Sequence, residues 1–161
     1  QSSRPPSHMT DENVLKSQSI LPRVDGIQKD VTKLRKLGKM NFVQFTQEPN
    51  YVLAQFYLRQ ALEGVFHIGS HILARIPGGR TIEYKDIAHK LGEFGIVEKE
   101  FADGALTKMA GYRNRLTHFY ADITVEEIYK IIRENLEDIE RYLTYIKDVV
   151  EHPEKFKLAI E

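Results

Sequence analysis

A short stretch of the sequence combines side chains that bind phosphate with one that transfers protons near neutral pH. It extends from Gly111 to Tyr120 and contains Gly-Tyr-Arg-Asn-Arg-Leu-Thr-His-Phe-Tyr. Arginine offers a planar fork of N–H donors that fits phosphate oxygens. Histidine is the side chain whose ordinary pKa suits general acid–base catalysis. Together these side chains could cleave RNA without a metal ion: His118 would activate a ribose 2′-hydroxyl and Arg113 would stabilise charge on the phosphorus.

The spacing of these residues suits a helix that loosens at its end. Asn114 and His118 are four residues apart, so they share one face of a helix. Arg113 and His118 are five residues apart, roughly 140° around an ideal helix. They converge only if the helix relaxes, which Gly111 and the turn that follows favour. The same residues also suit an ordinary helix C-terminus, where Arg and His interact favourably with the helix dipole.

The surrounding window is free of acidic residues. No Asp or Glu occurs between Asp103 and Asp122. Lys108 and Arg115 lie in this window and are further candidates for contacts to RNA phosphates, because such contacts are made mainly by Lys and Arg.

Two other groups of residues have a chemical interpretation beside a plainer one. Glu63, His67 and His71 recur every four residues on one helix face, as two metal-binding histidines of a helix can. Solvated or hydrogen-bonded histidines are the better interpretation, and we predict no metal site. Residues 75–90 could line an RNA groove by phosphate contacts and stacking, or could form a solvated face. Their basic and aromatic members are Arg75, Arg80, Tyr84, Lys85, His89 and Lys90.

Apolar residues at spacings of three and four predict the elements that position these side chains. The expected helices cover about 20–38, 51–76, 83–91, 96–117 and 124–150, with a loop or short turn at 39–50. The second carries two apolar stripes and is the central element. A capping box at Thr124–Glu127 opens the last. No alternating strand pattern is present. We therefore predict an all-α, up-and-down four-helix bundle with short additional helices.

Composition narrows the class of protein. The formal net charge is zero, which argues against a protein that coats polyanions indiscriminately. The charge is uneven, however: residues 1–121 hold 17 Lys and Arg against 12 Asp and Glu, while residues 122–161 hold 6 against 11. The acidic end is a solvated face or a docking surface for a basic partner. The absence of cysteine excludes disulfides, cysteine-ligated metal sites and thiol catalysis.

The sequence predicts one domain. Residues 1–8 resemble the remnant of an expression tag before Met9, and residues 9–161 are expected to form a single helical domain. No signal-peptide pattern or apolar run of bilayer length is present, so we expect a cytoplasmic protein without membrane association.

The segment Arg-Asn-Arg-Leu-Thr-His-Phe-Tyr resembles the HepT-like toxins of the HEPN superfamily. Their motif is Arg, four residues, His, one residue and Tyr, matched here by Arg113, His118 and Tyr120. The similarity extends over nearly the whole chain from about residue 20. It includes the Gln60–Glu63 and Ile68–Leu73 segments of the central helix, the mid-chain segments from Thr81 to Val97, and Asp122–Tyr129 at the start of the last helix.

The resemblance implies a function and partners. Such toxins are small all-α homodimers, alone or within larger toxin–antitoxin complexes of type II or type VII-like systems, whose two motifs meet between subunits. They are metal-independent ribonucleases, require no cofactor, and are neutralised by a minimal nucleotidyltransferase antitoxin. The resemblance gives Arg113 and His118 catalytic roles, Asn114 a supporting polar role, and Tyr120 the role of AMPylation site. An alternative is a non-catalytic HEPN subunit that binds a nucleotidyltransferase.

Overall fold

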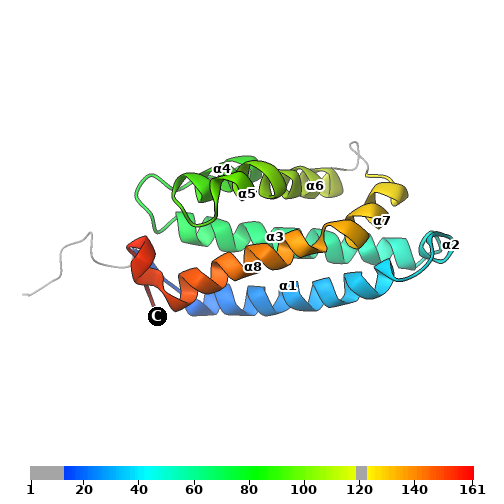
Figure 1. Cartoon of the computed structure of the whole chain (residues 1–161), viewed down its shortest axis with the longest axis horizontal. Helices are drawn as coiled ribbons and strands as arrows, with labels where there is room; N and C mark the ends of the chain where they lie inside the picture. The colour runs from blue at the N-terminus through cyan, green and yellow to red at the C-terminus, as the bar shows by residue number, and fades with distance from the viewer. Residues whose placement is uncertain (1–12, 119–122) are drawn as a thin grey trace, which may run out of the picture.

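Two long antiparallel helices, α1 (Ser17–Gly38) and α3 (Asn50–Leu73), form the base of the fold (Figure 1). The structure is a computed structural model that describes residues 13–118 and 123–161. Helix α1 buries the apolar stripe that the sequence predicts and ends at Gly38, as expected. Its buried apolar residues are Ile20, Ile27, Val31, Leu34 and Leu37.

Helix α3 is the central element, as its two apolar stripes predict. Figure 1 shows α4, α5 and α6 on one side of α3 and α1 on the other. Two glycines let these neighbours approach closely. A Cβ built on Gly64 would lie 2.9 Å from Ile27 Cγ1, and one on Gly69 would lie 2.9 Å from Leu91 Cδ1. A larger side chain at either position would therefore require its neighbour to shift.

The connection between α1 and α3 contains a single helical turn, α2 (Phe42–Phe45). The sequence predicts a loop or short turn here. Asn41 Oδ1 accepts a hydrogen bond from the Gln44 backbone N–H at 2.9 Å, while Gln44 Oε1 accepts one from the Asn41 N–H at 3.4 Å. This reciprocal capping box explains why so short a helix forms.

The helix expected from Ile96 to Thr117 begins slightly later and has three parts. They are α5 (Lys99–Phe101), the π-helical segment η3 (Ala102–Leu106) and α6 (Thr107–Thr117). The shorter α4 (Tyr84–Glu93) precedes them, as predicted. Thr107 Oγ1 donates a hydrogen bond to the Ala102 carbonyl at 2.7 Å within the wider π turn. Together these elements place α6, and with it the Arg–His motif, along α3.

The last predicted helix is divided in two, α7 (Val125–Glu134) and α8 (Leu136–Glu151). Asn135 leaves the helical region, with φ of −120° and ψ of 2°. The apolar spacing continues across this break, so hydrophobic periodicity does not reveal it. The predicted capping box is confirmed, because Thr124 Oγ1 accepts a hydrogen bond from the Glu127 N–H at 3.1 Å and Glu127 Oε1 accepts one from the Thr124 N–H at 3.4 Å.

A small parallel pair of strands joins the two ends of the described chain. Strand β1 (Val14–Leu15) pairs with β2 (Ala159–Ile160), which follows the 3₁₀ turn η4 (Pro153–Phe156). The Glu161 N–H donates to the Leu15 carbonyl at 2.9 Å. Two-residue strands are too short to show an alternating pattern, so the sequence does not predict them. The all-α prediction is otherwise confirmed.

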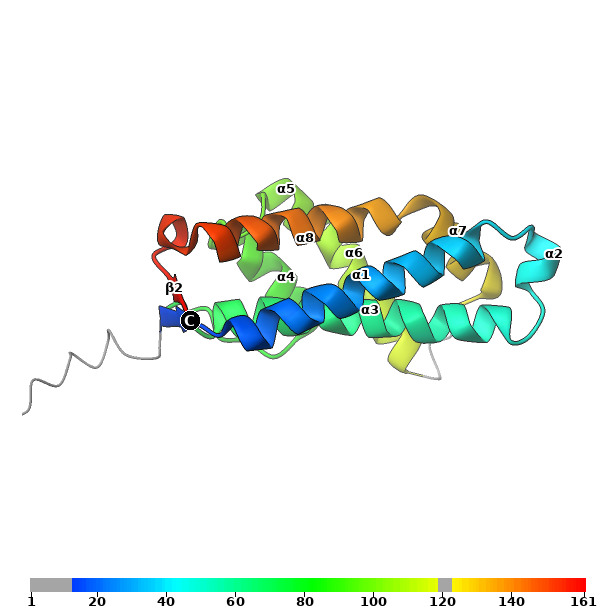
Figure 2. The ribbon, with the colours of Figure 1, turned by 90° about the horizontal axis from the view of Figure 1, so that it is seen from below.

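The buried apolar residues come from every α-helix, and one buried hydrogen bond joins α8 to α3. Figure 2 shows α8 running along the bundle beside α1. Tyr142 on α8 is fully buried and its hydroxyl donates to the Val65 carbonyl of α3 at 2.7 Å. No helix in residues 13–118 and 123–161 is long and apolar enough to cross a membrane.

Candidate active site

The predicted catalytic pair lies at the C-terminal end of α6. Arg113 and Asn114 are half-buried in the helix, which ends at Thr117. His118 is exposed and has extended backbone angles, φ of −98° and ψ of 109°, while its N–H still donates to the Asn114 carbonyl at 3.1 Å. The helix therefore ends between Arg113 and His118, which removes the fixed angular separation of an ideal helix. Arg113 Nη1 also donates to Asn114 Oδ1 at 3.4 Å.

Arg113 is held over an aromatic pair. Its guanidinium carbon lies 4.0 Å from the centre of the Tyr84 ring. The Tyr84 ring also stacks on the ring of Phe66, with 4.9 Å between ring centres and 29° between planes. Phe66 is fully buried in α3, and burial raises the pKa of the Tyr84 hydroxyl. A cation over a partly desolvated aromatic face gains a favourable electrostatic interaction.

The charge of Arg113 is not matched by a carboxylate. Within residues 13–118 and 123–161, Arg113 forms no ion pair, and its Nε is buried without a hydrogen-bond partner. An unsatisfied buried donor costs about 1–3 kcal/mol, and native proteins retain few of them. Such a donor on a half-buried cation is expected where an anion is to be bound rather than where only stability matters.

Arg115, two residues later, has a different environment. Its Nη1 and Nη2 donate to Glu127 Oε2 and Oε1 at 2.7 and 2.8 Å, a bidentate ion pair between α6 and the first turn of α7. This pair lowers the pKa of Glu127 to about 2. Arg115 thus fastens two elements together, and its predicted contact to RNA stays a prediction. Lys108, the other predicted contact, is exposed on α6.

The three residues considered as metal ligands separate into two environments. His71 Nε2 accepts a hydrogen bond from the Lys16 N–H at 3.1 Å, and burial together with nearby cations lowers the pKa of His71 to about 4. This ring nitrogen therefore binds the backbone at Lys16, just before α1. Glu63 instead forms an ion pair with Arg59 at 3.7 Å. The charge of Arg113 contributes to lowering the pKa of His67, after the larger effects of burial and Arg23. The described residues contain no group of three His, Cys, Asp or Glu side chains placed to hold a metal ion.

Part of the basic segment 75–90 is structural. Arg75 Nε donates to the Val14 carbonyl at 3.1 Å, and Lys90 Nζ donates to the Gly78 carbonyl at 3.0 Å. Tyr84, from the same segment, is the aromatic platform beneath Arg113. The sequence places Tyr84 in a possible RNA groove but does not reveal its pairing with Arg113, because the two residues come from different helices and no spacing rule connects them.

A groove of about 710 Å³ lies beside the end of α6. One wall belongs to α3, where Phe56 is 46% exposed and Arg59 is half-buried. The opposite wall contains Arg115 and Leu116 of α6 and residues 123–125. A groove with an exposed aromatic ring and arginines has the chemical character of a surface for single-stranded nucleic acid.

Most of the chain matches the model of a known protein family. A family described as ribonuclease HepT-like matches residues 27–146. The chain belongs to this family. The resemblance that the sequence analysis identifies is therefore confirmed, and the matched range of the HepT-like family includes α3, α4, α6 and α7 in full.

Similar proteins come from a toxin–antitoxin context. An mRNA nuclease HepT of Shewanella oneidensis is 22% identical over 131 residues, which are 80% of this chain and 96% of that relative. A mutant MntA–HepT toxin–antitoxin structure aligns with a TM-score of 0.71 at 21% identity, over 81% of this chain and 98% of that one. A tri-AMPylated HEPN toxin of Shewanella oneidensis, in complex with an MNT antitoxin, aligns with a TM-score of 0.72 at 21% identity, over 86% and 98%. At these identities, the structural similarity shows a shared fold.

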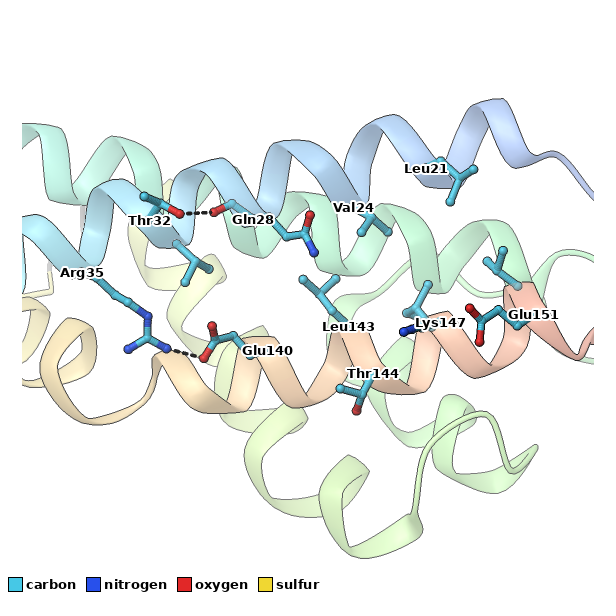
Figure 3. Close-up of a pocket in the computed structure, with 13 residues that line it drawn as sticks. Leu21, Val24, Gln28, Thr32, Arg35, Glu140, Leu143, Thr144, Lys147 and Glu151 are labelled. Atoms are coloured by element: carbon cyan, nitrogen blue, oxygen red, sulfur yellow. Dashed lines mark hydrogen bonds and ion pairs between the residues drawn. The ribbon is translucent and has the colours of Figure 1, made fainter.

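Two further features of this HepT-like chain concern the extent of the site. Tyr120, the predicted modification site, lies outside the described residues. A second groove, of about 450 Å³, lies between α1 and α8 and is lined by both aliphatic side chains, such as Val24 and Leu143, and polar ones, such as Gln28 and Thr144 (Figure 3). An ion pair between Arg35 and Glu140 bridges its two helices. It includes no residue of the Arg–His motif.

Proposed function

We propose that this chain is a toxin of a toxin–antitoxin pair and acts as a metal-independent endoribonuclease through Arg113 and His118. Its membership in the ribonuclease HepT-like family supports a nuclease. The observation that carries the assignment is the half-buried, carboxylate-free guanidinium of Arg113, close in sequence to an exposed histidine at the end of the same helix. A phosphodiester would supply the missing anion.

The chemistry requires no cofactor. Neutral His118 takes the proton of the ribose 2′-hydroxyl, whose oxygen attacks phosphorus while the bond to the 5′-oxygen breaks. Arg113 stabilises the extra negative charge that develops on the phosphoryl oxygens. The leaving 5′-oxygen receives a proton from protonated imidazole or water. The products are a 2′,3′-cyclic phosphate and a 5′-hydroxyl, and Asn114 supports the geometry through its contact with Arg113.

RNA cleavage in excess chelator tests this proposal. We expect wild type to cleave total RNA in EDTA and His118→Ala to lose about 10²–10⁴-fold in rate, the usual contribution of a general base. His152→Ala is the matched control, because His152 is an exposed histidine that directly follows a helix, α8. No cleavage by wild type, or equal cleavage by His118→Ala, would contradict the proposal.

The proposal also includes the oligomeric state of the protein and its antitoxin partner. We expect a homodimer whose motifs face one another, acting in the cytoplasm on cellular RNA. We also expect neutralisation by a minimal nucleotidyltransferase that AMPylates Tyr120, because the added phosphodiester would bring negative charge beside Arg113 and His118. The similar tri-AMPylated toxin in complex with an MNT antitoxin supports this expectation.

Growth assays and peptide mass spectrometry test whether a nucleotidyltransferase neutralises this chain. Expression of the chain alone should arrest growth, and co-expression with a neighbouring nucleotidyltransferase should restore it and add adenylyl mass to the peptide containing Tyr120. Harmless expression would favour the non-catalytic HEPN subunit. An unmodified peptide in a fully neutralised complex would mean that inhibition is steric. Light scattering that gave a monomer at micromolar concentration would exclude the shared site.

A further inference from the structure

The contact between Arg113 and Tyr84 is unusually close for this molecule. Among the cation–ring contacts of the described residues, the 4.0 Å separation is the shortest, and the others range from 4.8 to 6.0 Å. At 4.0 Å the guanidinium carbon is in van der Waals contact with the ring. The Tyr84 ring therefore restricts a side chain that otherwise has many rotamers.

The ring beneath Arg113 is itself immobilised. Phe66 of α3 is fully buried and stacks on Tyr84, which is the first residue of α4. Arg113 follows on α6. Side chains from three helices thus form one column that begins in the core and ends at a cation. The orientation of the guanidinium is consequently set by the packing of the bundle.

Stability alone does not account for this column. Arg113 forms no ion pair within the described residues, and its Nε is buried without a hydrogen-bond partner. An aliphatic side chain could cover the same ring without a desolvated charge. The hydroxyl of Tyr84 also forms no hydrogen bond within the described residues, so the part of Tyr84 that matters is its aromatic face.

We propose that Tyr84 is a positioning residue of the ribonuclease site, whose ring, backed by Phe66, holds the Arg113 guanidinium in one orientation for binding the scissile phosphate. This inference rests on the proposed function of Arg113. Tyr84 does not touch the reacting atoms. It reduces the reorganisation that Arg113 would otherwise undergo as charge develops on the phosphate.

A series of rings at position 84 tests the inference through cleavage rates. Tyr84→Phe should cleave RNA like wild type. Tyr84→Leu should lose about 10- to 30-fold, the effect expected for a desolvated cation–π contact. Pentafluorophenylalanine at position 84 keeps the shape and burial of the ring but removes the negative face, so it should fall close to Tyr84→Leu. A merely structural ring would give equal rates for phenylalanine and its fluorinated form.

Tyr145→Leu is the matched control. Tyr145 packs against Phe101 with 5.2 Å between ring centres and lies near Arg141, so it is a second tyrosine in contact with both an aromatic ring and an arginine. It belongs to α8 and not to the candidate site. Thermal unfolding of every variant, compared with that of Tyr145→Leu, separates lost packing from lost positioning. Cleavage by Tyr145→Leu should equal that of wild type.

A second readout does not depend on catalysis. In NMR spectra of the wild type, the Arg113 Nε–H should exchange slowly with water and be shifted by the ring current of Tyr84. Tyr84→Phe should keep both properties and Tyr84→Leu should lose both. Unchanged Arg113 signals or unchanged cleavage in Tyr84→Leu would overturn the positioning role while leaving the proposed ribonuclease intact. Absence of cleavage by wild type would instead overturn the proposed function, whatever the NMR result.

Discussion

Arg113 and Arg115 are two residues apart on one helix, yet their guanidinium groups have different partners. They point roughly 200° apart around α6. Arg115 meets both oxygens of Glu127, whereas Arg113 meets the face of Tyr84 and no carboxylate of the described residues. The charge of Arg115 is therefore used within the fold, and that of Arg113 remains available to a ligand. Proximity to the motif does not distinguish the two arginines, but their partners do.

The Arg115 environment also explains how the end of α6 is fixed. Glu127 both accepts from Arg115 and completes the capping box with Thr124. One carboxylate thus orders the first turn of α7 and binds the last turns of α6. The Arg115–Glu127 pair holds together the described chain on either side of residues 119–122, next to His118.

Replacement of Arg113 should have the largest effect, a strong loss of cleavage without a loss of stability. Arg113→Leu is expected to reduce RNA cleavage by about 10²–10³-fold, the loss typical of a donor that stabilises transition-state charge. Its melting temperature should equal or exceed that of wild type, because leucine covers Tyr84 without an unsatisfied Nε. Single-turnover cleavage and thermal unfolding measure the two effects. A large fall in melting temperature would show that Arg113 belongs with Arg115 as a structural residue.

Replacement of Arg115 should have the reverse effect. Arg115→Leu is expected to lower stability by about 1 kcal/mol, the upper end for a partly exposed pair with bidentate geometry. For a chain of this size, that corresponds to a fall of about 2–4 °C. Cleavage should remain within a few-fold of wild type. Tenfold weaker cleavage at unchanged melting temperature would break the comparison and support Arg115 as a contact to RNA.

The smallest effect concerns pH. Arg115 holds the folded-state pKa of Glu127 at about 2, below its ordinary 4.5. A lowered carboxyl pKa adds stability above pH 4.5 that is lost as the pH falls toward 2. The difference in melting temperature between wild type and Arg115→Leu should therefore be full at pH 7 and shrink between about pH 4.5 and 2. Glu127→Gln can still accept the capping hydrogen bonds but has no carboxyl group to titrate. The difference in melting temperature between Glu127→Gln and Arg115→Leu should therefore not shrink over this pH range.

The sequence predicts those parts of the fold that follow from local patterns. The spacing of apolar residues gives α1 and α3, and Thr124 with Glu127 marks the start of α7. The break at Asn135 is missed because the apolar spacing continues through it. The candidate site also has one part that the sequence predicts and one part that it does not. The motif points to Arg113 and His118, whereas the platform of Tyr84 and Phe66 arises only when three helices pack together. The catalytic roles themselves remain predictions.

The strand pair that joins Leu15 to Glu161 places the two ends of the described chain side by side. Its two described ends meet at the end of the bundle opposite α7 (Figure 1). We therefore expect the helices to keep their arrangement when the chain is opened at another point. A circularly permuted chain, with its ends linked through this pair and a new opening between α2 and α3, would retain every helix that builds the Arg113 column.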